Sequence, residues 1–187
     1  MSTATDWITR QANILNNIAA NLVPIHHLIT GAAYVIGLLF AFKAIYTLKA
    51  YGEARSMMSS SNAGLKEPLM YLLVAGIFIY LPTGVAIMLQ TTFGSSSILQ
   101  YAAVNSNNKT MNTIFGSGSL VGRPLTLIIQ TIGLIAFVRG WILIARSASQ
   151  GQPPGGTGKG LMHVFGGIMA MNIVATLEII NNTLYGA

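Results

Sequence analysis

Four long apolar segments follow one another along the chain, separated by polar stretches. They cover residues 28–48, 69–90, 125–145 and 161–177, and the second and fourth contain no Asp, Glu, Lys or Arg. Each approaches the ~20 residues that a helix needs to cross a ~30 Å hydrocarbon core. The rest of the chain is too short to cover four buried helices in a soluble core. The pattern therefore predicts four transmembrane helices.

The N-terminal segment has a different pattern. Thr5 and Asp6 offer a helix N-cap, and apolar residues then recur at roughly helical spacing up to Leu22. Pro24 follows, and a proline inside a helix removes one hydrogen bond and clashes with the preceding turn. We therefore expect residues 1–24 to form a separate amphipathic helix that ends at Pro24.

The connections divide the remaining chain into three parts. Two short connections, residues 49–66 and 146–159, are basic, whereas the longer connection over 91–124 is rich in Ser, Thr, Asn and Gly. The sequence thus predicts a first helical hairpin over 25–90, a polar connector over 91–124 and a second hairpin over 125–187. A short surface helix is expected within 101–115.

The composition supports a membrane protein. Only 7% of the 187 residues are charged, whereas about a quarter are charged in a typical soluble domain. The formal net charge is +6, and seven of the ten basic residues lie in or beside the two short connections. The other three are Arg10, Lys109 and Arg123. Because cytoplasmic loops carry the excess of Lys and Arg, this split places both short loops in the cytoplasm and the connector and termini outside.

The two hairpins resemble each other in sequence. The run IGLLFAFKA at 36–44 aligns with IGLIAFVRG at 132–140, so that Lys43 corresponds to Arg139. Further on, KEPLM at 66–70 aligns with KGLM at 159–162 across a small gap. A doubled hairpin in parallel orientation follows from this internal repeat.

No motif for catalysis or metal binding stands out, and we expect neither an enzyme nor a metal site. Cysteine is absent, and the adjacent His26 and His27 would point about 100° apart on a helix. The glycine-rich run at 155–160 differs from a phosphate loop, because Gly160 stands where a Ser or Thr would hold magnesium and Pro153 replaces the first glycine. The four acids are too dispersed for acid–base chemistry.

Small residues recur at spacings that allow close helix packing. Such stripes let two backbones approach each other, either within one subunit or between subunits. The packing candidates are Ala33, Gly37, Ala41, Gly133, Gly166 and Ala170.

The second hairpin carries a family resemblance. The run IGLIAFVRGW at 132–141, the ARS that follows at 145–147 and LMHVFGGIMAMN at 161–172 are similar to the IcmC/DotE, IcmD/DotP and TraQ group. That group consists of small integral membrane proteins of type IVB (Dot/Icm-like) secretion and IncI-type conjugation systems. The resemblance implies a structural part of such a machine. Each half also resembles a conjugative pilin, which has two apolar helices and a basic loop, although this chain is doubled.

The resemblance implies a pilin-like subunit that polymerises with lipid into a pilus or trans-envelope conduit. The expected partners are many copies of the same chain, membrane lipid and other secretion subunits, with non-specific contact to transferred nucleic acid. No cofactor is expected beyond retained phospholipid. The expected location is the bacterial inner membrane before assembly and the cell surface after it. The basic candidates for contact with lipid headgroups or a lumen are Lys43, Lys49, Arg55, Lys66, Arg139, Arg146 and Lys159.

Two alternatives remain open. One is an inner-membrane component of the secretion channel that does not polymerise. The other is a small transporter or ion-conducting protein, which would need polar groups deep in the bundle or paired broken helices. Pro82 interrupts the second apolar segment, but no proline interrupts the fourth. The sequence therefore favours assembly over transport.

Overall fold

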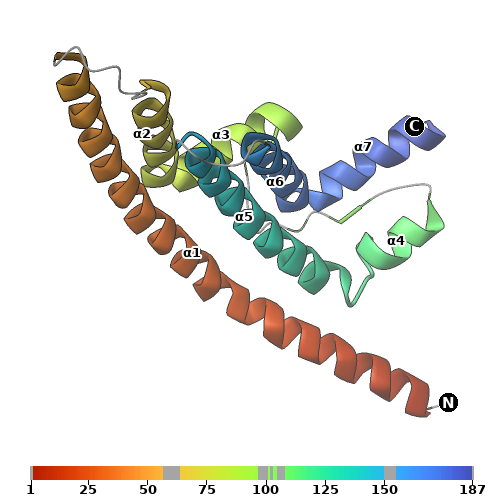
Figure 1. Cartoon of the computed structure of the whole chain (residues 1–187). Coiled ribbons are helices and arrows are strands. Elements are labelled where there is room, and N and C mark those ends of the chain that lie inside the picture. The colour runs from red at the N-terminus through yellow and green to blue at the C-terminus, as the bar shows by residue number, and fades with distance from the viewer. Residues whose placement is uncertain are drawn as a thin grey trace. The chain divides into compact units, whose positions relative to one another are not determined.

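The computed structural model describes residues 2–56, 64–96, 101, 103–104, 108–149 and 155–186, and these residues form seven helices and no strand (Figure 1). Parts of both basic loops, 57–63 and 150–154, and of the connector lie outside the described residues. The all-helical prediction is confirmed for the described part of the chain. The helices are α1 (Ser2–Ser56), α2 (Lys66–Ile79), α3 (Leu81–Phe93), α4 (Lys109–Phe115), α5 (Gly122–Ser147), α6 (Gly156–Met171) and α7 (Ile173–Tyr185).

The N-terminal segment is not a separate helix. α1 continues for 55 residues and contains Pro24 in its interior, so the predicted helix end at Pro24 is wrong. A proline costs a helix one backbone hydrogen bond, but apolar helices tolerate it when neighbouring groups satisfy the freed carbonyl. What changes near this position is the packing partner, because residues up to His27 and residues from Leu28 belong to different compact units.

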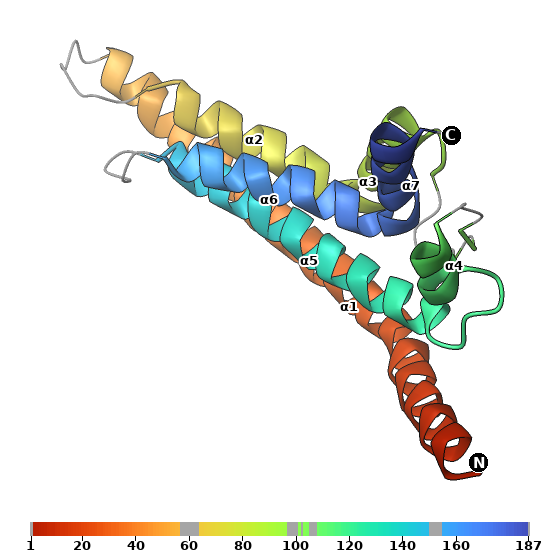
Figure 2. The ribbon, with the colours of Figure 1, turned by 90° about the vertical axis from the view of Figure 1, so that its right-hand side faces the viewer.

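The chain forms two compact units. We call Met1–His27, Ala86–Ile135 and Gly167–Ala187 the connector unit, and Leu28–Val85 with Ala136–Gly166 the loop unit. The segments of α1, α2, α5 and α6 that belong to the loop unit run side by side (Figure 2). The connector unit holds the start of α1, the first half of α5, and the helices α4 and α7.

The outside of the loop unit is apolar. Large side chains such as Phe42, Tyr46, Met162 and Phe165 are more than half exposed. An apolar surface of this extent is typical of a membrane or partner interface. Thr9–Ser56 and Gly122–Ser147 are long and apolar enough to cross a membrane, and two bent helix pairs raise the number of candidate spans to four. These helices are compatible with a membrane location.

The second apolar segment is divided by a sharp bend. α2 and α3 meet at Tyr80 at an angle of 89°. Pro82 accounts for the bend, because it has no N–H to donate to the carbonyl of Phe78 and its ring clashes with that carbonyl in a straight helix. The break that Pro82 predicts is therefore present.

The fourth apolar segment is bent as well, although it contains no proline. α6 and α7 meet at Asn172 at an angle of 93°. The hydroxyl of Thr176 donates to the carbonyls of Met169 and Asn172, both at 2.9 Å, and so satisfies a carbonyl that the bend frees. The Asn172 side chain donates to Ser95 Oγ at 3.2 Å. The expectation that only the second segment is interrupted is wrong, since side-chain hydrogen bonds stabilise the second bend.

A glycine lies against the last turn before the first bend. A Cβ added to Gly37 in α1 would lie 2.9 Å from Phe78 Cβ, 3.1 Å from Ile79 N and 3.3 Å from Ala75 O. Real Cβ atoms rarely approach other atoms this closely. Glycine is therefore required where α1 packs on α2.

The second hairpin repeats this contact. A Cβ on Gly133 in α5 would lie 2.9 Å from Ala170 Cβ, 2.8 Å from Met171 N and 2.9 Å from Gly167 O. Gly133 follows Gly37 by 96 positions, and each of its three neighbours follows the corresponding neighbour of Gly37 by 92. The internal repeat is thus present at the level of individual atoms, including the bend that follows each contact.

We expect Gly133→Ala to destabilise the protein by about 1–3 kcal/mol, because the new methyl group would meet backbone atoms that cannot move independently. The matched control is Gly166→Ala in α6, where no atom lies within 4 Å of an added Cβ. Thermal unfolding in detergent measures the midpoint temperature of each variant. Equal midpoint temperatures for Gly133→Ala and Gly166→Ala would contradict the close contact of Gly133 with α6.

Candidate functional site

The ends of the helices that carry the two basic loops lie together in the loop unit. The Tyr71 hydroxyl in α2 is hydrogen-bonded to the Ser149 hydroxyl, just after α5. Ser147 Oγ lies 2.8 Å from Thr157 Oγ1 in α6. These contacts bring the start of α2, the end of α5 and the start of α6 to one end, which we call the basic end.

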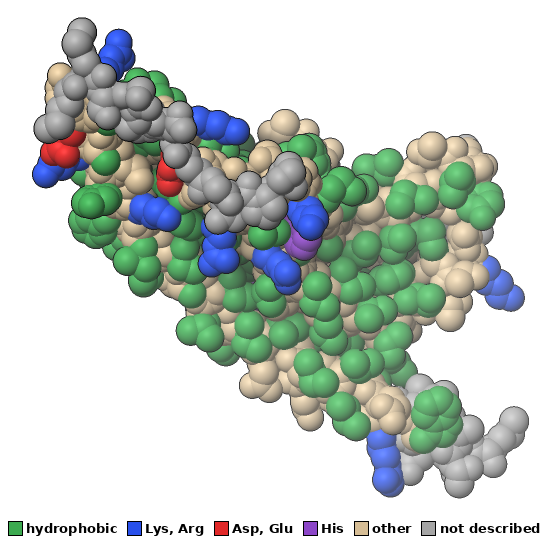
Figure 3. All heavy atoms as spheres, in the orientation of Figure 1, with side chains coloured by type: hydrophobic (Ala, Val, Ile, Leu, Met, Phe, Trp, Pro, Cys, Tyr) green, Lys and Arg blue, Asp and Glu red, His purple; other side chains and the backbone are tan. Residues whose placement is uncertain are grey.

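Lys and Arg side chains gather at the basic end (Figure 3). Arg55 and Arg146 lie in the last turns of α1 and α5, where a cation is favoured by the helix dipole. Lys66 is the first residue of α2, and Lys159 lies in the first turn of α6. Cations at helix N-termini oppose the dipole, so helix stability does not explain these two lysines.

Lys43 and Arg139, which correspond in the repeat, lie further along their helices. Lys43 Nζ lies 4.4 Å from the centre of the Tyr71 ring. The Phe40 ring stacks on the same Tyr71 ring, with 5.6 Å between the two ring centres. A cation over an aromatic face gains about 0.5–1 kcal/mol at an exposed site. Because Tyr71 also contacts Ser149, this stack directs Lys43 toward the basic end. The Arg139 side chain is exposed.

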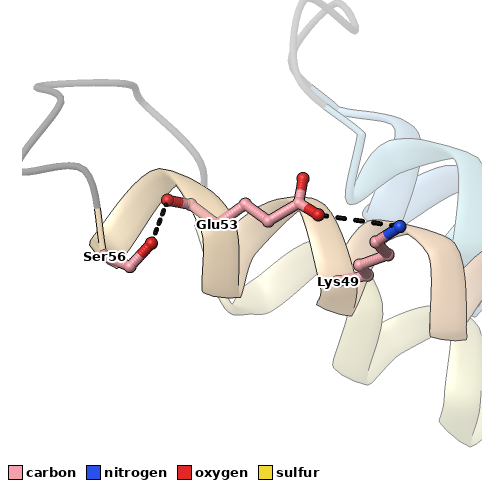
Figure 4. Close-up of polar contacts among 3 residues, drawn as sticks. All are labelled: Lys49, Glu53 and Ser56. Carbon is pink, nitrogen blue, oxygen red and sulfur yellow. Dashed lines mark hydrogen bonds and ion pairs between the residues drawn. The ribbon is translucent and has the colours of Figure 1, made fainter.

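Acidic residues offset only a small part of this charge. Lys49 Nζ lies 3.6 Å from Glu53 Oε1, and both side chains are more than half exposed (Figure 4). Such an exposed pair contributes about 0.3–0.5 kcal/mol. Glu67 lies in the first turn of α2 beside Lys66, whereas α6 has no acid in its first turn. The basic end therefore carries an excess of positive charge.

A second group of polar residues is buried in the connector unit. His26 Nε2 lies 2.9 Å from Thr131 Oγ1, and the Thr131 hydroxyl donates to the Leu127 carbonyl at 2.8 Å. Since the hydroxyl hydrogen is used there, His26 is the donor to Thr131. Thr126 is completely buried one turn before Gln130, and its hydroxyl has no hydrogen-bond partner among the described residues. The sequence pattern did not reveal this group, because 105 positions separate His26 from Thr131.

The packing candidates have different surroundings. Ala33 is buried, and Ala41 is half-buried. Gly37 and Gly133 make the contacts described above, the second of them with Ala170. Gly166 is exposed with open space beside it. Four of these residues therefore lie in contacts within one chain: Ala33, Gly37, Gly133 and Ala170.

A second tight contact between α5 and α6 lies nearer the basic end. A Cβ on Gly140 would lie 2.7 Å from Gly160 O and 2.7 Å from Val164 N. The packing candidates predicted from the sequence do not include Gly140 and Gly160, although Gly133 and Gly140 on α5, like Gly160 and Gly167 on α6, are seven residues apart. That spacing places each pair on one helix face and could have revealed the contact.

The described residues contain no group of three or more His, Cys, Asp or Glu that could hold a metal ion. Comparisons with protein-family models, with curated proteins and with solved structures found no match to this chain.

We expect Thr131→Val to destabilise the protein by about 1–3 kcal/mol, because the buried His26 Nε2–H would lose its acceptor. The matched control is Thr126→Val on the same helix. It removes a buried hydroxyl without a partner in the described part of the chain, so the stability should stay the same or rise. Unfolding curves in detergent compare the stability of the two variants. A larger loss of stability in Thr126→Val than in Thr131→Val would refute the hydrogen bond from His26 to Thr131.

Proposed function

We propose that this protein is a non-enzymatic structural subunit of a type IV (IVB) conjugation or secretion apparatus. In this proposal it is a pilin-like membrane protein that polymerises with lipid into a pilus or trans-envelope conduit. The observation that carries the proposal is the basic end, where the helix ends that flank both basic loops lie together. The similarity to the IcmC/DotE, IcmD/DotP and TraQ group supports the same function.

The basic end suits contact with phosphate groups. Lys159 lies at a helix N-terminus without a neighbouring acid, and the contact of Ser147 with Thr157 brings the last turn of α5, which holds Arg146, beside it. Helix N-termini and basic side chains both attract anions. In an assembly, this end of each copy would contact anionic headgroups or a passing nucleic-acid strand through non-specific phosphate attraction.

The membrane layout that we propose has four crossings in the inner membrane, with the basic end in the cytoplasm. α2 has 14 residues and is about 21 Å long, which is shorter than a ~30 Å hydrocarbon core. Because α3 and α7 turn nearly perpendicular to α2 and α6, we propose that each of them lies along the outer surface of the membrane beyond its bend. Glycine contacts within each hairpin leave the apolar outer faces available to lipid and to further copies.

The topology predicts opposite labelling of two introduced cysteines. Because the natural chain has no cysteine, Ser149→Cys and Ser117→Cys each introduce a single thiol. In intact cells, a membrane-impermeant maleimide should label the variant at Ser117 in the connector, and should label the variant at Ser149 only after permeabilisation. Labelling of Ser149→Cys in intact cells would reverse the proposed orientation.

The charge at the basic end should be needed for function. We expect Arg146→Gln combined with Lys159→Gln to lower transfer about ten-fold or more at unchanged membrane levels, because two phosphate contacts are lost. Lys109→Gln removes a charge from α4 and serves as the control. Mating or secretion assays measure transfer, quantitative blots measure protein level, and micrographs count filaments. Wild-type transfer and filaments in the double variant would mean that these charges only orient the protein.

One observation favours a second candidate function, a small transporter or ion-conducting protein. Both hairpins have a broken second helix at corresponding positions, and such paired breaks form the binding sites of many transporters. Buried polar groups such as His26 and Thr126 fit the same function. Ion flux into vesicles that contain the purified chain would support transport. Filament formation by the chain, together with no ion flux into such vesicles, would support assembly.

A further inference from the structure

A groove of about 460 Å³ lies within the connector unit, between α1 and α5. Four residues of α1 line one side, at positions that share a helix face, and two residues of α5 line the other. The small side chains of Ala19 and Ala20 leave space between the two helices. The lining residues are Asn16, Ala19, Ala20, Val23, Arg123 and Leu127.

The groove has a polar end and an apolar end. His26 contacts Thr131, and Leu22 packs in one cluster with Leu127, so α1 and α5 run in the same direction here. Asn16 therefore lies at the level of Arg123, and the apolar residues follow further along both helices. A polar end with a basic side chain and an apolar channel beside it match the two parts of a phospholipid.

The polar end attracts anions for two independent reasons. Arg123 is exposed in the first turn of α5, where the positive end of the helix dipole adds to its charge. Among the described residues, no carboxylate lies within ion-pair distance of Arg123 and no acid lines the groove. A bound anion would therefore offset a positive charge that the described part of the chain leaves uncompensated.

We propose that this groove binds one anionic phospholipid. Its phosphate contacts the Arg123 guanidinium and the Asn16 amide, and one acyl chain lies along Ala19, Ala20 and Val23. The volume falls within the ~300–1,000 Å³ of typical ligand sites. The site does not depend on whether the protein assembles or transports.

The test is native mass spectrometry of the full chain released from nanodiscs made of equal parts phosphatidylglycerol and phosphatidylcholine. The wild type should retain one phosphatidylglycerol in preference to phosphatidylcholine. Arg123→Gln should lower this retention about five-fold or more, because it removes one charge contact, whereas Arg123→Lys should keep most of it. Ala20→Phe should lower retention of both lipids by filling the groove, and Lys109→Gln, which removes a charge elsewhere, should have no effect.

Three results would overturn the site. The first is equal retention of the two lipids by the wild type. The second is unchanged retention in Arg123→Gln, which would place the bound lipid elsewhere. The third is the same loss in Lys109→Gln as in Arg123→Gln, which would show a general effect of net charge. Thermal unfolding of each variant shows whether it is folded, and Ala20→Leu replaces Ala20→Phe if the larger side chain prevents folding.

Discussion

The fold depends on one contact that occurs twice, in which a glycine of a long helix lies against the backbone of the last turn before a bend. Gly37 makes it with α2 and Gly133 makes it with α6. At both places the nearest atoms include a backbone nitrogen, so no larger residue fits unless the helices separate. The close approach fixes the packing of each hairpin just before its second helix changes direction. The two bends, at Tyr80 and Asn172, have different causes. At the first, Pro82 has no N–H to donate to the helix. At the second, the Thr176 hydroxyl donates a hydrogen bond to the Met169 carbonyl. The same geometry is therefore maintained by different chemistry.

The hairpins also determine where charge and polarity lie. The Tyr71–Ser149 and Ser147–Thr157 contacts bring together the helix ends from which the two basic loops extend. Lys159 lies in the first turn of α6, which holds no acid and where the helix dipole is unfavourable for a cation. Helix stability does not explain this charge, and we propose that it contacts phosphate groups. In the connector unit, by contrast, the buried His26 of α1 is hydrogen-bonded to Thr131 of α5.

The sequence predicts the helical class, the apolar segments and the repeat, because helix formation and membrane burial depend on local composition. It also indicates Gly37 and Gly133 as packing residues, but glycine spacing does not reveal the partner helix. The sequence predicts that a helix ends at Pro24, but α1 continues through it, because an apolar helix tolerates a proline when neighbouring groups satisfy the freed carbonyl. The bend at Asn172 and the pairing of His26 with Thr131 depend on side chains that meet only after folding, so local patterns carry no signal for them.

The central claim is that many copies of this chain assemble, with their basic ends on one surface. The most direct measurement is electron microscopy of material sheared from the cell surface and of purified envelopes, with an antibody against the exposed connector as a label. The account predicts ordered filaments or rings in which the label repeats regularly. Dispersed single copies, together with ion or solute flux through vesicles that contain only this chain, would contradict it.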